Sequence, residues 1–191
     1  VPAELICFIG NIVGALAGYQ LIKQGIDVTV EAGAGEGASF SDAAYAAAGA
    51  TIATGAAEAV AGADVILKVQ RPLLGGAEGI DELAGAKPGA VLIAILAPYQ
   101  SQDAIAEYAK RGVTAFAMEL MPRITRAQVM DVLSSQSNLA GYRAVVDATA
   151  AIGRAFPMMM TAAGTIAPAR VLVLGAGVAG LQAIATARRL G

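Results

Sequence analysis

Three glycines near the end of the sequence have the spacing of a phosphate-binding turn. Gly175, Gly177 and Gly180 form the pattern G-x-G-x-x-G directly after the apolar run VLVL at residues 171–174. In this pattern the first glycine permits a tight turn, the second lets a pyrophosphate approach the main chain, and the third lets a helix pack closely on a strand. The pyrophosphate would meet the free N–H groups and the positive dipole end of the helix that follows. We therefore predict a dinucleotide site here, and the competing interpretation is a purely structural strand-to-helix turn.

A second group of polar side chains precedes this turn in the sequence. Gln128, Asp131 and Ser134 are three residues apart, which predicts that they form a row along one flank of a helix. A structural interpretation makes Thr125 the helix N-cap and Gln128 the side chain that completes a capping box. It does not account for the Ser, Gln and Asn side chains that continue over residues 134–138, because Ser and Asn are poor helix-interior residues. We favour a binding site for a polar ligand, whose candidate residues are Arg123, Gln128, Asp131 and Ser134.

The composition excludes several kinds of chemistry. The chain has no histidine, so it lacks the commonest general base and the commonest metal ligand, and we predict no metal site. Cys7 is the single cysteine, which rules out an internal disulfide and fits a reducing compartment. The formal net charge of -2, with no cluster of Lys and Arg, gives no indication of nucleic-acid binding. A second glycine loop at residues 31–40 contains Glu31 and Glu36, which would repel phosphate, so we interpret it as a structural connection.

The elements that would position these residues alternate between apolar runs and helix-like stretches. Continuous apolar runs are typical of parallel strands that are covered on both faces, and their alternation with helices predicts βαβ units. Ser41 is the expected N-cap of one helix, Ser101 with Asp103 the expected start of another, and Gly112 its C-terminal stop. The predicted strands are residues 26–31, 50–53, 63–69, 89–96 and 113–118, and the predicted helices are residues 41–48, 78–83 and 101–111.

After Pro122 the pattern becomes helical. Apolar residues keep a helical spacing from Arg126 to about Phe156, which predicts one long helix, broken near Gly141. A loop then leads from Pro157 into a predicted strand at residues 171–174. The predicted architecture is α/β: a Rossmann-like parallel-sheet domain, a long linking helix, and the first βα unit of a second Rossmann domain. The expected domain bounds are residues 1–121, 122–157 and 158–191.

The N-terminal segment allows two interpretations. Residues 5–22 contain no charged side chain, and Gly10, Gly14 and Gly18 are four apart. As one helix this segment would measure about 27 Å, near the lower limit for crossing a bilayer, with glycines at a helix-contact spacing. We favour a first strand at residues 5–9, a turn, and a buried first helix, because polar Asn11 and Gln20 and the strand that follows fit an α/β unit.

Three stretches of the sequence closely resemble the NAD(H)-binding alpha subunit of proton-translocating nicotinamide nucleotide transhydrogenase. They are residues 121–145, 156–164 and 168–191. The wider family includes alanine dehydrogenase. The matching stretches read MPRITRAQVMDVLSSQSNLAGYRAV, FPMMMTAAG and PARVLVLGAGVAGLQAIATARRLG. The resemblance runs from about Ile22 to Gly191. It does not extend before about Leu21, where the family has an Arg-containing strand and turn.

The resemblance implies a role for each candidate residue. Asp131 and Ser134 would hold the carboxamide and ribose of NAD(H). Arg123 and Gln128 would help to position the facing NADP(H), so Gln128 and Asp131 would act in catalysis by positioning. The implied cofactor-binding set is Arg123, Ile124, Gln128, Asp131, Ser134, Gly175, Gly177, Val178 and Gly180. The implied cofactors are NAD(H) on this chain and NADP(H) on a partner domain.

The resemblance also implies partners and a location. These are a membrane proton channel and an NADP(H)-binding domain, a second copy of the chain in a homodimer, and a peripheral position at the cytoplasmic face of the bacterial inner membrane. The ribose-binding acid expected about 20 residues after the glycine turn would lie beyond Gly191. We therefore expect the isolated 191-residue chain to be catalytically incompetent.

Two alternatives remain open at this stage. Alanine dehydrogenases use a histidine and a lysine around the keto acid, and Lys68 matches the lysine position, whereas LIAILAPYQ at residues 92–100 stands where the histidine is expected. This favours transhydrogenase over an alanine-dehydrogenase-like oxidoreductase. The other alternative is a non-catalytic module that dimerises through the first domain and the long helix.

Overall fold

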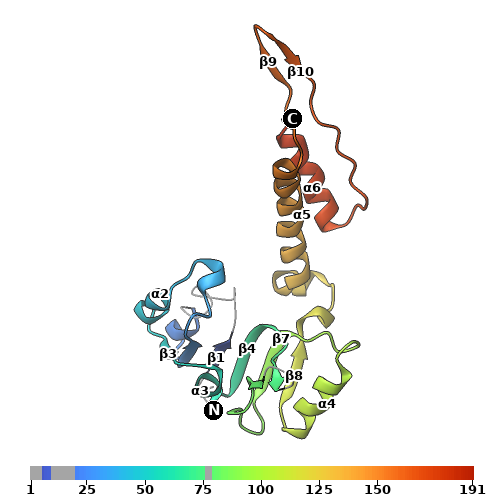
Figure 1. Ribbon diagram of the computed structural model, residues 1–191. Coiled ribbons are helices and arrows are strands. Elements are labelled where there is room, and N and C mark those ends of the chain that lie inside the picture. The colour runs from blue at the N-terminus through green and yellow to red at the C-terminus, as the bar shows by residue number, and fades with distance from the viewer. Residues whose placement is uncertain (1–5, 10–19, 76–78) are drawn as a thin grey trace. The chain divides into compact units, whose positions relative to one another are not determined.

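The computed structural model describes residues 6–9, 20–75 and 79–191. The chain divides into two compact units, Val1–Met121 and Pro122–Gly191, whose elements are drawn in Figure 1.

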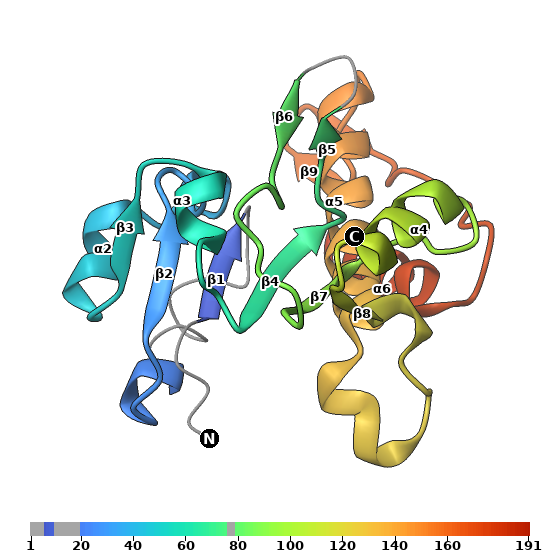
Figure 2. The ribbon, with the colours of Figure 1, turned by 90° about the horizontal axis from the view of Figure 1, so that it is seen from below.

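The first unit is built on a six-stranded sheet in the order β3-β2-β1-β4-β7-β8. Every neighbouring pair is parallel, and the strands run side by side in Figure 2. Leaving out the short hairpin strands β5 and β6, this is the order 3-2-1-4-5-6 of Rossmann sheets, so the predicted fold class is confirmed. The strands are β1 (Ile6–Ile9), β2 (Val28–Glu31), β3 (Thr51–Ala53), β4 (Val65–Gln70), β7 (Val91–Ile95) and β8 (Thr114–Ala117).

Strand β1 bears on the two interpretations of residues 5–22. Because Ile6–Ile9 pairs with β2 on one side and β4 on the other, this segment is not one continuous membrane-spanning helix. The turn and helix predicted next fall mainly on residues 10–19, outside the described residues of the chain. Among the described residues, no helix combines the length and the apolar character that a membrane span requires.

Helices α2 (Asp42–Ala47), α3 (Ala56–Val60) and α4 (Gln102–Lys110) belong to the described part of the first unit. Ser41 is the N-cap of α2 as predicted, because its hydroxyl accepts from the N–H of Ala44 at 3.3 Å. Ser101 is the residue before α4, but its hydroxyl does not cap the helix. It bonds to the Arg71 guanidinium instead. Gly112 ends α4 with φ +70°, a left-handed conformation that favours glycine.

The helix predicted at residues 78–83 is wrong. Strand β6 (Ile80–Asp81) pairs antiparallel with β5 (Leu74–Gly75), and the N–H of Glu82 donates to the Leu73 carbonyl at 2.9 Å. Gly79 has φ +68°, outside helical geometry. In the hairpin the main-chain N–H and C=O groups bond across the two strands. The composition of six consecutive residues does not reveal such a pairing. Two short 3-10 turns, η1 (Glu36–Ala38) and η3 (Met118–Leu120), also belong to this unit.

The core of the first unit is formed by side chains of the sheet and of the helices that pack on it. The largest side chains with almost no exposure are those of Val30, Val60, Ile66, Leu83, Leu92, Leu96 and Tyr108. The alternating burial along β7 places Leu92 and Ala94 in this core. In the second glycine loop, the N–H of Gly33 donates to the Asp42 carboxylate at 2.9 Å and 3.2 Å, so this donor is used within the chain.

The second unit consists of η4 (Thr125–Met130), α5 (Val132–Ala151), the hairpin β9 (Met159–Thr161) with β10 (Gly164–Ile166), and α6 (Val178–Arg189). Figure 1 shows α6 lying along α5 and the hairpin projecting from the helix pair. Its small core joins Val145 of α5, Ala183 of α6 and Phe156.

Several predictions for this unit are corrected. The long helix begins at Val132 rather than at residue 126, so Thr125 is not its N-cap and Gln128 completes no capping box. The Asp131 carboxylate is the N-cap instead, and the preceding six residues form a 3-10 turn. The helix ends at Ala151 and is continuous through Gly141. The loop expected after Pro157 contains the β9–β10 hairpin.

The strand predicted at residues 171–174 is not formed among the described residues. Residues 171–174 form no strand, because a strand requires hydrogen bonds to a neighbouring strand. The exposed fractions of Leu172 (83%) and Leu174 (89%) show apolar side chains that a neighbouring sheet would cover.

Candidate functional site

The glycine turn requires glycine at two of its three positions for internal reasons. Gly175 has φ +115°, which side chains rarely adopt. A Cβ on Gly180 would lie 2.1 Å from the Gly175 carbonyl oxygen, so this glycine permits the close packing predicted for it. At Gly177, by contrast, a Cβ would meet nothing within 4 Å. No contact within the described chain explains the glycine at position 177, and the space above it is open to a ligand.

The start of α6 has the properties of an anion-binding helix terminus. Gly177 is the N-cap and supplies no side-chain hydrogen bond, and the first turn contains no acidic residue. The N–H groups of the first turn have no partner inside a helix and carry its positive dipole end. Arg188 and Arg189 lie in the last turn, at the negative end. Val178, the first helical residue, is 41% exposed beside the turn.

The start of α5 holds two of the candidate residues in direct contact. Asp131 Oδ1 accepts from the N–H of Ser134 at 2.9 Å, and Oδ2 accepts from the Ser134 hydroxyl at 2.6 Å. These bonds, aided by the charge of Arg123, hold the pKa of the Asp131 carboxyl below its usual range, so it is ionised at neutral pH. A carboxylate has about four acceptor sites, so Asp131 keeps free lone pairs for a ligand amide or hydroxyl.

The other candidates in this region lie on an exposed segment. Arg123, Ile124 and Gln128 are exposed, Ile124 to 56%. Gln128 lies in the 3-10 turn η4, so it does not continue the row of Asp131 and Ser134 along the flank of α5. The structure therefore brings Asp131 and Ser134 together, with Arg123 within electrostatic reach of Asp131, and it leaves Gln128 on a separate element.

Helix α5 also contacts α6 directly. Asn138 Nδ2 donates to Gln182 Oε1 at 3.4 Å, which links the polar turns of α5 to the helix that follows the glycine turn. Gln182 has no sequence signal, because its position opposite Asn138 depends on how two helices pack.

Lys68 of the first unit lies in a buried cluster of charges. Its Nζ pairs with Glu82 Oε1 at 2.6 Å, and the exposed fractions of the two side chains are 8% and 11%. Glu82 Oε2 also accepts from the N–H of Leu73 at 2.5 Å. Burial raises the pKa of the nearby Glu31 carboxyl, and the Glu82 charge raises it further. The positive charge of Lys68 is therefore already paired with a carboxylate of the same chain, that of Glu82.

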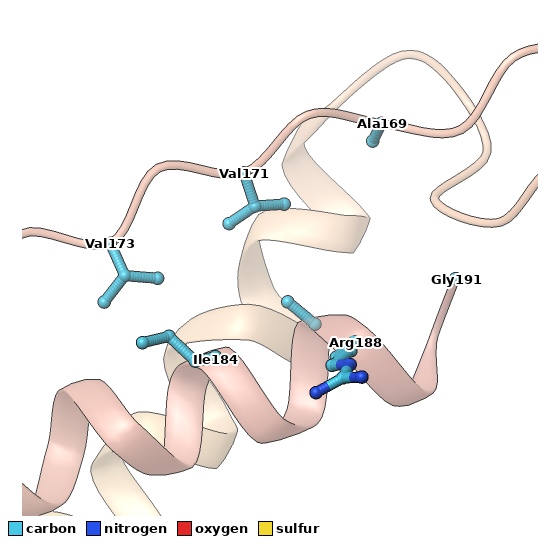
Figure 3. A pocket seen from close by; sticks show the side chains of 7 residues that line it. Ala169, Val171, Val173, Ile184, Arg188 and Gly191 are labelled. Atoms are coloured by element: carbon cyan, nitrogen blue, oxygen red, sulfur yellow. The ribbon is translucent and has the colours of Figure 1, made fainter.

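A shallow apolar pocket of about 290 Å³ lies beside α6 (Figure 3). Val171 and Val173 from the extended segment face Ile184 of α6, with Arg188 and Gly191 at one end. Arg188 is the one charged side chain among the residues that line the pocket, and none of them carries a carboxyl or hydroxyl side chain. The pocket therefore offers no set of groups that could orient a nucleotide.

Known proteins resemble this chain over most of its length. The model of the alanine dehydrogenase/PNT N-terminal domain matches residues 18–140, and that of the C-terminal domain matches residues 144–191. An NAD(P) transhydrogenase subunit alpha protein of Rhodospirillum rubrum is 62% identical over 172 residues, which are 90% of this chain and 44% of that protein. The crystal structure of transhydrogenase from Sinorhizobium meliloti has a TM-score of 0.89 and 54% identity, and the match covers 98% of this chain and 57% of that one.

Alanine dehydrogenase of Halomonas elongata is more distant, at 32% identity over 175 residues, 90% of this chain and 45% of that protein. The chain thus spans about half the length of the relatives it matches. Since the two domain models together match most of its residues, the chain belongs to the alanine dehydrogenase/PNT family.

Proposed function

We propose that this chain is the NAD(H)-binding component of a proton-translocating transhydrogenase, in which hydride passes from NADH to NADP+ on a partner domain while protons cross the membrane. The open space above Gly177 carries the proposal. Gly175 and Gly180 are explained by conformation and packing, whereas the open space at Gly177 fits a ligand that approaches the main chain there.

The residues present fit a dinucleotide. The first-turn N–H groups of α6 would bind the pyrophosphate, with Gly175, Gly177, Val178 and Gly180 around it. The free lone pairs of the Asp131–Ser134 pair would accept from the carboxamide and the ribose hydroxyls. Exposed Arg123, Ile124 and Gln128 would contribute at the face turned toward NADP(H). Gln128 and Asp131 would act by positioning the cofactor.

The chemistry suits a chain without histidine. The bound nicotinamide supplies the hydride, and transfer to a second nicotinamide requires alignment of the two rings rather than a side-chain acid or base. The chain's own residues would therefore hold the cofactor in one orientation, which is what a carboxylate–hydroxyl pair at a rigid helix start can do.

The alternative, an alanine-dehydrogenase-like activity, is disfavoured by the state of Lys68. A lysine that binds a keto acid needs a free ammonium, whereas Lys68 is paired with Glu82 at 2.6 Å in a buried setting, and Glu31 adds a second nearby carboxyl. An incoming keto-acid carboxylate would meet these acids. The sequence also lacks the histidine of that branch.

The partners we propose are a membrane domain that conducts protons, an NADP(H)-binding domain, and a second copy of the chain. The β9–β10 hairpin supports the homodimer. All six of its strand residues are exposed, and Met160 is exposed to 71%, so apolar side chains project where a second copy could cover them. The proposed location is peripheral, at the cytoplasmic face of the bacterial inner membrane.

The test uses the full gene product that carries this sequence, assembled with its partner subunits in vesicles. We expect NADH-dependent reduction of an NADP+ analogue, and at least a tenfold loss in rate for Asp131→Ala. A protein that catalyses reductive amination of pyruvate would support the alanine dehydrogenase alternative. A stable dimer that does not bind NADH in the full gene product would support a non-catalytic module.

A further inference from the structure

The contact between α5 and α6 is built on a glycine. Gly141 lies near the middle of α5 and is buried. A Cβ at this position would lie 2.1 Å from the Ala179 carbonyl oxygen and 2.9 Å from its carbonyl carbon. Helix propensity alone favours alanine over glycine in a helix interior. The glycine therefore permits the main chain of α6 to touch α5 directly.

The touching residue belongs to the proposed nucleotide site. Ala179 is the second residue of α6, in the turn whose free N–H groups face the proposed pyrophosphate position. On the other helix, Gly141 lies ten residues after the N-cap Asp131, a distance of about 15 Å along a straight helix. One rigid helix thus carries the Asp131–Ser134 pair and also sets where the first turn of α6 lies.

We propose that Gly141 is a positioning residue that sets the separation between the Asp131–Ser134 pair and the glycine turn, and thereby matches the site to the length of a dinucleotide. This inference rests on the proposed NAD(H) binding. Ordinary van der Waals contact begins at 3.4 Å, so an alanine here would push the first turn of α6 away by roughly 1 Å. A displacement of about 1 Å between binding elements can cost on the order of 100-fold in activity.

The experiment compares three alanine variants of the full gene product that carries this sequence, with its partner subunits. For Gly141→Ala we expect NADH affinity and hydride transfer to fall by about 10- to 100-fold, while NADP+ affinity at the partner domain is unchanged. Gly153→Ala controls for the substitution itself, because a Cβ at Gly153 meets nothing within 4 Å. Val145→Ala controls for stability, because Val145 is buried in the small core that joins α5 and α6. The NADH affinity of this variant should stay within about twofold of the parent protein.

Each outcome decides between explanations. If the parent protein does not bind NADH, the proposed function fails, and this inference fails with it. If the parent binds NADH and folded Gly141→Ala binds equally well, only the inference is overturned. Equal losses in Gly141→Ala and Val145→Ala would also overturn it, because they would indicate a general effect of stability.

A milder variant covers the case in which Gly141→Ala does not fold. Asn138 is exposed, and its hydrogen bond to Gln182 is a further contact between the same two helices. Asn138→Ala should fold normally and weaken NADH binding by about threefold. Unchanged NADH affinity in Asn138→Ala, together with a Gly141→Ala that does not fold, would contradict a positioning role for this helix contact.

Discussion

Replacing Lys68 by methionine tests how the first unit holds its buried charges. Methionine keeps the length and apolar stem of lysine but removes the ammonium that pairs with Glu82 at 2.6 Å. The exposed fractions of the two side chains, 8% and 11%, place the pair among buried ion pairs, for which removal of one partner costs about 3–5 kcal/mol. Glu31 increases the cost, because two neighbouring carboxyls would then remain without the cation.

The assay is urea unfolding followed by circular dichroism, which gives the free energy of unfolding. We expect Lys68→Met to lower it by about 3–5 kcal/mol at pH 7. The double variant Lys68→Met/Glu82→Gln should recover most of this loss, because glutamine carries no charge and can still accept the N–H of Leu73. Lys110→Met is the matched control: Lys110 is 75% exposed and pairs with Glu107 at 3.4 Å, so its loss should cost less than about 1 kcal/mol.

Two results would refute this reasoning. If Lys68→Met costs no more than Lys110→Met, the Lys68–Glu82 pair is not buried in solution. If the double variant is as unstable as Lys68→Met, the loss comes from packing of the lysine stem and not from an unpaired carboxylate.

Three further predictions concern a carboxyl, the hairpin and the isolated chain. Glu31→Gln should raise the melting temperature at pH 7, because folding raises the pKa of this carboxyl. Ionised Glu31 destabilises the folded protein above its folded-state pKa, and this effect is absent below the ordinary value of 4.5. The melting temperatures of the parent protein and Glu31→Gln should therefore converge in acid. A difference that does not change with pH would contradict the raised pKa of Glu31. Met160→Asp in the exposed hairpin should shift the full gene product from dimer to monomer in light scattering, whereas an unchanged dimer would place the interface elsewhere. The isolated 191-residue polypeptide should bind NADH with a Kd above about 100 μM in calorimetry, since residues 171–174 form no strand that would hold the glycine turn in place, and tighter binding would overturn that expectation.

The sequence by itself determined the features that depend on local chemistry. Continuous apolar runs located the parallel strands of the first unit, because a strand covered on both faces is rich in apolar residues. Ser41 is identifiable as an N-cap because its hydroxyl bonds only three residues along the chain. The conformation of Gly175 and the packing of Gly180 follow from their spacing, since the turn and the helix that follows involve neighbouring residues.

Tertiary structure decided where local patterns allow more than one answer. A helix is predicted at residues 78–83, but Ile80 and Asp81 pair with the neighbouring strand and the N–H of Glu82 donates to the Leu73 carbonyl, which makes a hairpin. A capping box at Thr125 is plausible by spacing, yet the Asp131 carboxylate caps the helix, because both of its oxygens reach Ser134. These choices depend on competing hydrogen-bond partners whose energies are similar.

The contacts that join distant segments have no sequence signal at all. The resemblance to alanine dehydrogenase makes Lys68 a candidate for binding a keto acid, but the fold places Glu82, fourteen residues away, against its ammonium. The glycine at position 141 predicts a break in the helix, and the structure shows an unbroken helix whose glycine admits the main chain of α6. A sequence records which residues are small or charged, whereas the packing of two elements determines what each of them meets.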